Sequence, residues 1–141
     1  AGLKDGLEGS GCEIFWEYNY ARGNQNTSEI IASKKQVDYL VILDNWALEE
    51  VGEAAEENKY HGAKIYGVGS SEKAIVLLDN QNIECLVVPD DYETGYMSMN
   101  EIAKKLRHSF YKMNSCETEV RIINKEDLYS KDLERFLYSY E

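Results

Sequence analysis

Three short apolar runs recur along the chain at nearly equal spacing, and a helical pattern follows each of them. The runs occupy residues 38–43, 63–68 and 84–88, and the helical stretches open near Asn45 and near residues 71 and 92. A strand–helix repeat of roughly 20–25 residues is typical of βαβ units, which build a parallel sheet with helices packed against it. We therefore predict an α/β fold with a mostly parallel sheet and helices on both of its faces.

The flanking segments extend this pattern. Before the repeats we expect a helix over residues 1–8, a strand over 13–18, a polar loop over 19–26 and a short helix over 27–34. After them we expect a long helix to about residue 110, a strand over 119–123 and a final helix capped by Asn124. Because the chain opens within a helical pattern, we expect it to be a piece of a longer protein. The long helix carries an apolar stripe made of Tyr96, Met99, Ile102, Ala103 and Leu106.

Polar and aromatic side chains gather where the predicted strands end. In open α/β sheets, ligands bind outside the carboxyl ends of the strands, so these side chains are the candidates for a binding site. Helix capping is the alternative interpretation for several of them, because Ser, Asp and Asn also start helices. The candidate ligand-binding residues are Tyr18, Tyr20, Arg22, Asp44, Asn45, Trp46, Ser70 and Asp90.

Composition and spacing exclude several other functions. A net charge of −11 over 141 residues repels phosphate backbones, so we expect no nucleic-acid binding. No apolar run approaches the ~20 residues of a membrane span. His61 and His108 are isolated from ligand-spaced partners, and Ser70 and Ser71 lack the pattern of a nucleophile elbow. We therefore predict no metal, no cofactor and no catalytic residues.

The segment 38–106 resembles the C-terminal lobe of type I periplasmic (solute-) binding proteins of the sugar-binding branch. The resemblance rests on VDYLVILDNWAL at 37–48, KIYGVGSS at 64–71 and LVVPDDYETGY at 86–96, in this order and spacing. It implies a Rossmann-like or flavodoxin-like lobe over residues 1–91. Residues 92–141 would then form a hinge crossover helix with a closing strand and helix that belong to the other, N-terminal lobe.

The chain departs from the family pattern at three positions of the binding site. Polar residues of the family fall on Leu43, Gly69 and Pro89, whose side chains cannot hydrogen-bond to a sugar hydroxyl. The neighbouring polar residues named above would take over this role. The resemblance then implies an interlobe cleft in which polar groups bind the hydroxyls of a solute and aromatic rings stack on its apolar face.

The resemblance also implies a biological role. The parent protein would be the substrate-binding component of an ABC transporter, specific for a small polar solute such as a sugar, and would work with a permease or a membrane sensor. It would be extracytoplasmic, in the periplasm or lipid-anchored at the cell surface, and it would not be an enzyme. Two alternatives stay open at this point: the effector-binding domain of a transcriptional regulator, which shares the fold, and a flavodoxin-like or Rossmann-like enzyme.

Separation from a second lobe would leave apolar surface bare. The helix over 92–110 and the strand over 119–123 would lose their main partners, and bare apolar faces and unpaired strand edges promote association. We therefore predict that a second copy of the chain covers them in a homodimer.

Overall fold

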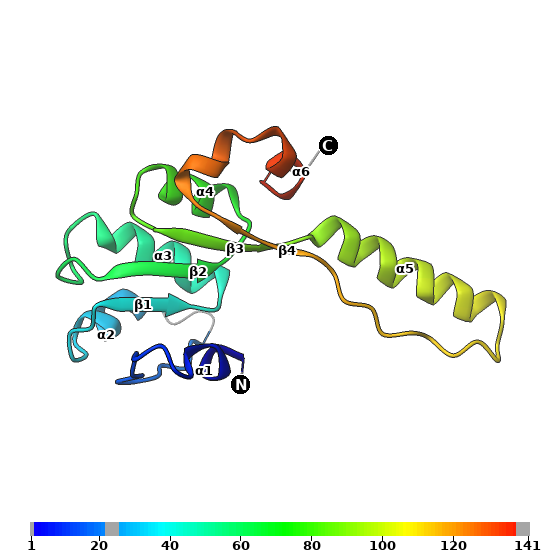
Figure 1. The fold of residues 1–141 in the computed structure, drawn as a ribbon, viewed down its shortest axis with the longest axis horizontal. Coiled ribbons are helices and arrows are strands. Elements are labelled where there is room, and N and C mark those ends of the chain that lie inside the picture. The colour runs from blue at the N-terminus through cyan, green and yellow to red at the C-terminus, as the bar shows by residue number, and fades with distance from the viewer. Residues whose placement is uncertain (1, 22–25, 138–141) are drawn as a thin grey trace.

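The computed structural model describes residues 2–21 and 26–137 of the chain. The sheet has four strands. Figure 1 shows helices behind this sheet and a long helical arm that projects from its end. The elements in order are α1 (Gly2–Leu7), α2 (Thr27–Ala32), β1 (Tyr39–Ile42), α3 (Asn45–Ala55), β2 (Lys64–Val68), α4 (Glu72–Asp79), β3 (Cys85–Pro89), α5 (Asp91–Arg107), β4 (Val120–Ile123), the 3₁₀ helices η1 (Lys125–Tyr129) and η2 (Lys131–Leu133), and α6 (Glu134–Leu137).

The sheet has the strand order β1-β2-β3-β4. The first three strands are parallel, with Leu40 beside Ile65 and Gly67 beside Leu86. The fourth strand is antiparallel to β3 and places Ile123 beside Leu86. The predicted α/β class with a mostly parallel sheet is therefore confirmed. Residues 119–123, which we had expected to lie in the other lobe, here extend the same sheet.

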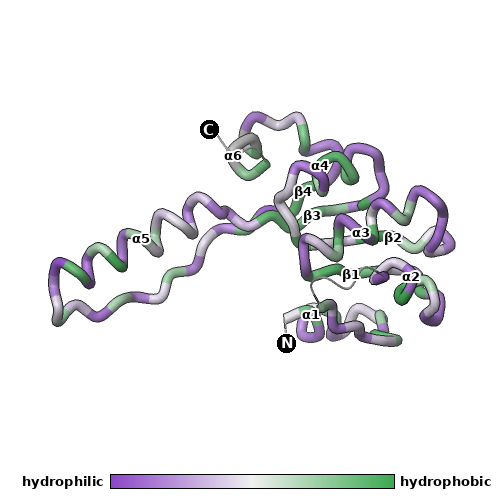
Figure 2. The backbone as a smooth tube through the Cα atoms, turned by 180° about the vertical axis from the view of Figure 1, so that it is seen from behind, coloured by the Kyte–Doolittle hydropathy of each residue, from purple (hydrophilic) through white to green (hydrophobic). Residues whose placement is uncertain are grey.

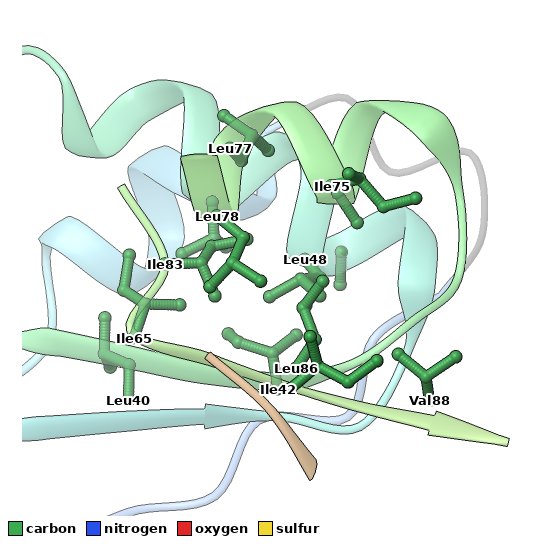
Figure 3. Packing of buried hydrophobic residues seen from close by; sticks show 14 of the residues in the cluster. Leu40, Ile42, Leu48, Ile65, Ile75, Leu77, Leu78, Ile83, Leu86 and Val88 are labelled. Atoms are coloured by element: carbon green, nitrogen blue, oxygen red, sulfur yellow. The ribbon is translucent and has the colours of Figure 1, made fainter. Parts of the chain in front are cut away.

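The core lies between this sheet and the helices α3 and α4. Leu48 and Leu78 come down from the helices onto strand residues such as Ile65 and Leu86, whereas Leu77 lies on the side of α4 next to Gly52 of α3 (Figure 3). Four of these five side chains are at most 1% exposed, and Leu77 is 4% exposed. At roughly 1.5–3 kcal/mol for each fully buried aliphatic side chain, this layer is the main source of stability for the fold.

Helices pack against only one face of the sheet in the part of the chain that is described. Figure 2 views the molecule from that side, with α3 and α4 in front of the strands. The expected helices on the second face are not there. Both crossovers, β1-α3-β2 and β2-α4-β3, step along the sheet in the same direction. Two crossovers of the same hand that step in one direction place their helices on the same face.

Residues 13–18 do not form the predicted strand. The indole Nε1 of Trp16 donates to the carbonyl oxygen of Lys35 at 2.9 Å, and Trp16 and Tyr20 pack against the core. These contacts hold the segment beside the connection between α2 and β1 rather than in the sheet. Residues that favour strands do so because they pack well on a half-buried surface, not because of an intrinsic backbone preference. The strand-favouring residues at 13–18 pack outside the sheet, so the prediction of a strand was wrong.

The final helix is interrupted. The backbone N–H of Asn124 donates to Asp127 Oδ2 at 2.9 Å, as expected of a helix start, but two 3₁₀ helices and one turn of α-helix follow instead of a continuous helix. Ser130, which follows η1, has an extended backbone that ends the turn. Phe136 and Leu137 still reach the core.

The segment 91–119 forms an arm that leaves the sheet after β3 and returns before β4 (Figure 1). Asp90 caps α5 by accepting from the N–H of Glu93 at 2.8 Å. The carboxylate of Glu101 joins the helix to the returning chain, because it accepts from the N–H of Asn114 at 2.9 Å and from the hydroxyl of Tyr111. No helix among the described residues is long and apolar enough to cross a membrane.

Candidate ligand site at the strand ends

The carboxyl ends of β1, β2 and β3 meet at the edge of the sheet from which the arm projects (Figure 1). We call this region the carboxyl edge: residues 43–46, 69–71 and 89–92. Four of the eight predicted site residues lie beside β1 and β2 within it, and Asp90 follows β3. In open α/β sheets, this edge is where ligands bind.

The end of β1 supplies a cap and an exposed ring. Asp44 Oδ1 accepts from the N–H of Ala47 at 3.0 Å, which fixes the start of α3. Trp46 stands in the first turn of that helix and is 55% exposed. Because the Trp46 ring is exposed rather than buried in the core, it provides an aromatic surface at the edge of the candidate site.

Asn45 belongs to a network that joins β1 to β2. Its Nδ2 donates to Glu49 Oε1 at 2.8 Å, and Ser71 Oγ donates to the same oxygen at 2.7 Å. The Asn45 Oδ1 atom is buried and has no hydrogen-bond partner among the described residues. Glu49 was not predicted, although its position four residues after Asn45 on a helix is a signal for such a pair.

At the end of β2, the backbone of Gly69 lies close to Asn45, and Ser70 is hydrogen-bonded to the arm. A Cβ at Gly69 would collide with Asn45 Oδ1, so any other residue there would require the Asn45 side chain to move. The next residue, Ser70, donates from Oγ to Asp91 Oδ2 at 3.0 Å and thereby links β2 to the first turn of α5. The hydroxyl predicted as a ligand contact is therefore placed at the base of the arm.

The end of β3 holds a buried acid. Asp90 is 6% exposed, and its carboxylate is directed into the first turn of α5 as the cap already described. Beyond it, the rings of Tyr92 and Tyr96 stack with centroids 6.5 Å apart and an interplanar angle of 9°. Both rings are exposed and were not among the predicted site residues.

The remaining candidates lie elsewhere or cannot be placed. Tyr20 is half-buried and packs against the core, and Tyr18 is half-buried in the segment before it. Arg22 lies outside the described residues. Within the part of the chain that is described, no group of three or more His, Cys, Asp and Glu side chains could hold a metal ion.

Chemically, the carboxyl edge has carboxylate, amide and hydroxyl groups beside exposed aromatic rings. Such a surface suits a small polar molecule with an apolar face, since the polar groups hydrogen-bond and the rings stack. It is an open edge, formed by one sheet and the arm.

Comparison with known proteins identifies the family. Residues 1–109 match the family model of the periplasmic binding protein domain. The chain belongs to this family. The resemblance inferred from the three sequence blocks is therefore confirmed. No curated protein matches the chain at a significant level.

Solved structures share the fold. A carbohydrate-transporter solute-binding protein from Agrobacterium radiobacter, in complex with D-arabinose, superposes with a TM-score of 0.79 and is 21% identical; the match covers 97% of this chain and 48% of that one. An ABC-transporter solute-binding protein from Agrobacterium vitis with bound D-fucose has a TM-score of 0.78 and 16% identity, over 97% and 49%. The XylFII–LytSN complex has a TM-score of 0.59 and 20% identity, over 72% and 35%.

The chain thus spans about half the length of the first two of these structures. Those two are solute-binding proteins of transporters, with a sugar bound. At these identities the likeness establishes the fold of this chain.

Proposed function

We propose that the chain is one lobe, with the hinge arm, of an extracytoplasmic solute-binding protein that serves as the substrate-binding component of an ABC transporter. The observation that carries this proposal is the match of nearly the whole chain to about half of two sugar-bound solute-binding proteins. The solute would be a sugar or a sugar-like polar molecule. It would bind between the carboxyl edge and a second lobe, and no chemical step would follow.

The candidate contacts of this lobe are polar groups and rings at the carboxyl edge. Trp46 would stack on the solute, and Asn45 and Ser70 would exchange hydrogen bonds with its hydroxyls. Asp44 and Asp90 would contribute negative potential while they cap their helices. Tyr18, Tyr20 and Arg22 remain predicted contacts, and they would have to approach the site from the segment before α2.

The hinge would lie where the chain leaves and re-enters the sheet. The N–H of Asp90 donates to the carbonyl oxygen of Glu119 at 3.0 Å, so the two crossing segments run side by side at the base of the arm. The hydroxyls of Thr94 and Thr118 meet at 3.1 Å just beyond. On this proposal, residues 1–91 form most of the lobe, β4 and the helices after it complete its sheet and core, and α5 packs on the second lobe.

Partners and location follow from the same proposal. The parent protein would deliver its solute to an ABC permease or report it to a membrane protein; XylFII, a structural neighbour, forms a complex with LytSN. The solved neighbours are transporter proteins, which favours a receptor over the effector domain of a regulator. A homodimer of the 141-residue chain by itself is also proposed.

The test is a thermal-shift and calorimetric screen of the full-length parent protein against D-arabinose, D-fucose, other monosaccharides, nucleosides and amino acids. Binding to the native state raises stability by about 2.7 kcal/mol at a ligand concentration one hundred times Kd. We expect a rise in Tm and a saturable heat with one or a few sugars. A rise with nucleosides or amino acids alone, or with none of the compounds, would overturn the sugar assignment.

A further inference from the structure

One carboxylate oxygen at the carboxyl edge joins side chains from two helix starts. Glu49 Oε1 accepts from Asn45 Nδ2 at 2.8 Å and from Ser71 Oγ at 2.7 Å. Asn45 is the first residue of α3 and Ser71 is the N-cap of α4, so the shared oxygen links the segments that follow β1 and β2. All three residues are half-buried. Hydrogen bonds to a carboxylate are stronger than those between neutral groups, and they fix the groups that make them.

Ser71 holds the Glu49 carboxylate in place. The Ser71 hydroxyl accepts from the N–H of Ala74 at 3.2 Å as the cap of α4, and its own O–H donates to Glu49. Both roles of the hydroxyl are therefore used, and its hydrogen has one direction. A carboxylate that is held from the neighbouring helix can in turn fix the orientation of a third group.

The third group is the amide of Asn45. An ionised carboxylate accepts hydrogen bonds and donates none, so the Asn45 atom that faces Glu49 has to be the nitrogen. The amide oxygen, Oδ1, then lies on the other side, where it is buried without a partner among the described residues. A buried acceptor without a partner is unfavourable. The orientation of the amide is therefore set by Glu49 and not by the hydrogen-bonding needs of Oδ1.

Gly69 provides the space for this oxygen. A Cβ at position 69 would collide with Asn45 Oδ1, so the amide lies against the backbone of the residue that follows β2. The Asn45 amide thus brings a polar group from α3 to the end of β2, where residue 69 itself has no side chain.

We infer that Glu49 is a positioning residue of the carboxyl edge, which holds Asn45 so that an amide N–H, rather than the amide oxygen, is offered to the solute. The nitrogen carries two hydrogens, and Glu49 takes one of them. Oδ1 is buried and so does not meet a solute. The solute atom opposite Asn45 is then a hydrogen-bond acceptor, such as a hydroxyl or ring oxygen of a sugar. The role toward a solute rests on the proposed function, whereas the orientation of the amide does not.

A second glutamate on α3 supplies the matched control. Glu53, one turn further along the helix, pairs with Lys73 of α4 at 2.7 Å. Both glutamates therefore join α3 to α4, but Glu49 also contacts the candidate site residue Asn45. A role of Glu49 in helix packing alone predicts that the variants Glu49→Ala and Glu53→Ala behave alike. A positioning role predicts that they differ in every measurement that reports on Asn45.

The first experiment uses the isotope-labelled full-length parent protein without solute. The NMR signals of the Asn45 side-chain amide, identified by their loss in Asn45→Ala, are compared among the variants, with circular dichroism as the check of folding. We expect Glu49→Ala to shift these signals and to speed their hydrogen exchange, and Glu53→Ala to leave them as in the wild type. Unmoved signals in Glu49→Ala, or the same change in Glu53→Ala, would overturn the positioning role.

A further variant perturbs Asn45 from its other side and leaves Glu49 intact. The Cβ that Gly69→Ala adds would push against Asn45 Oδ1, so we expect the Asn45 amide signals to move in this variant as well. Wild-type signals in Gly69→Ala would show that the amide oxygen does not lie against this strand end, and would overturn the proposed orientation.

The second experiment is a double-mutant cycle on the affinity for D-arabinose and D-fucose, the sugars bound in two structural neighbours, by isothermal titration calorimetry. We expect Glu49→Ala and Asn45→Ala each to raise Kd roughly 3- to 10-fold, the range of one hydrogen bond. The variant that carries both changes should bind as Asn45→Ala does, because the group that Glu49 positions is already gone. Additive losses, or an equal loss in Glu53→Ala, would overturn the inference.

The two experiments separate this inference from the proposed function. Binding of neither sugar by the wild type would overturn the donor role of Asn45 toward them, together with the sugar assignment. Unmoved Asn45 signals in Glu49→Ala with intact sugar binding would instead overturn the positioning role and leave the proposed function standing.

Discussion

The backbone of Gly67 in β2 lies directly against the side chain of Leu48 from α3. A Cβ at position 67 would lie 2.7 Å from Leu48 Cδ2 and nearer still to Cδ1. Leu48 is fully buried, so its side chain has no free space to move into. The helix therefore sits as close to the sheet as it does because residue 67 has no side chain.

We expect Gly67→Ala to destabilise the chain by about 1–3 kcal/mol, the usual range for an overpacked core. The measurement is urea denaturation followed by tryptophan fluorescence and circular dichroism. The matched control is Gly95→Ala on α5, where an added Cβ would touch nothing within 4 Å. Because Gly costs a helix interior roughly 0.5–1 kcal/mol relative to Ala, the control should be neutral or stabilising. Equal losses in both variants would contradict the packing argument.

Two adjacent serines are expected to differ in their effect on stability. Ser71 Oγ accepts from the N–H of Ala74 at 3.2 Å, which caps α4, and donates to Glu49, whereas Ser70 Oγ makes an exposed bond to Asp91. Ser71→Ala should cost about 1 kcal/mol, typical of a lost N-cap. Ser70→Ala should change the free energy of unfolding by less than ~0.5 kcal/mol. Chemical denaturation of the two variants makes the comparison, and a larger loss at Ser70 would contradict it.

The fold was predictable because its signals are local. The three apolar runs and the capping residues Asp44, Ser71 and Asp90 set the strands and helix starts, and all of them act within a few residues. The wrong predictions, such as the strand over residues 13–18, concern segments whose structure depends on packing against distant parts of the chain. The β-forming residues around Trp16 are fixed by a contact with Lys35, which no local pattern reveals.

The placement of the candidate residues at one edge of the sheet was predictable, but their contacts were not. Strand ends located Asp44, Asn45, Trp46 and Ser70 at one edge, since that follows from topology. The sequence could not show that Glu49 is shared by side chains from two strand ends, because that depends on how α3 and α4 pack. Nor could the composition of the strands show that only one face of the sheet is covered.

The hydrogen bonds that Glu101 accepts from Asn114 and Tyr111, which we call the clasp of the arm, are expected to depend on pH. The N–H of Asn114 and the ammonium group of Lys104, together with the hydroxyl of Tyr111, lower the pKa of Glu101 to about 2 from its ordinary value of 4.5. A lowered pKa in the folded state stabilises the clasp above pH 4.5, and this stabilisation is lost as the pH falls toward 2. We expect the hydrogen-exchange protection factor of the Asn114 amide to fall across this window.

A neutral variant separates this effect from general acid unfolding. Glu101→Gln should reduce the protection factor of the Asn114 amide already at pH 7. Between pH 4.5 and 2, the protection factor of this variant should change less than that of the wild type. The control is Glu117→Gln on the same arm, an exposed carboxylate that should leave the pH profile of the wild type unchanged. Wild-type protection in Glu101→Gln would show that the carboxylate does not hold the arm.

In the full-length parent protein, Trp46→Ala should weaken solute binding about tenfold, since loss of aromatic stacking costs roughly 0.5–1.5 kcal/mol beyond the lost area. Asp44→Asn should also weaken binding while it keeps an oxygen that can accept from the N–H of Ala47, so that a loss of affinity is not a loss of the helix cap. Isothermal titration calorimetry measures Kd for both variants and for Val76→Ala, the control on the outer side of α4. The control should bind as the wild type does. If Trp46→Ala and Asp44→Asn also keep the wild-type Kd, the solute does not contact this end of β1, and the binding surface of this lobe must lie elsewhere than the carboxyl edge.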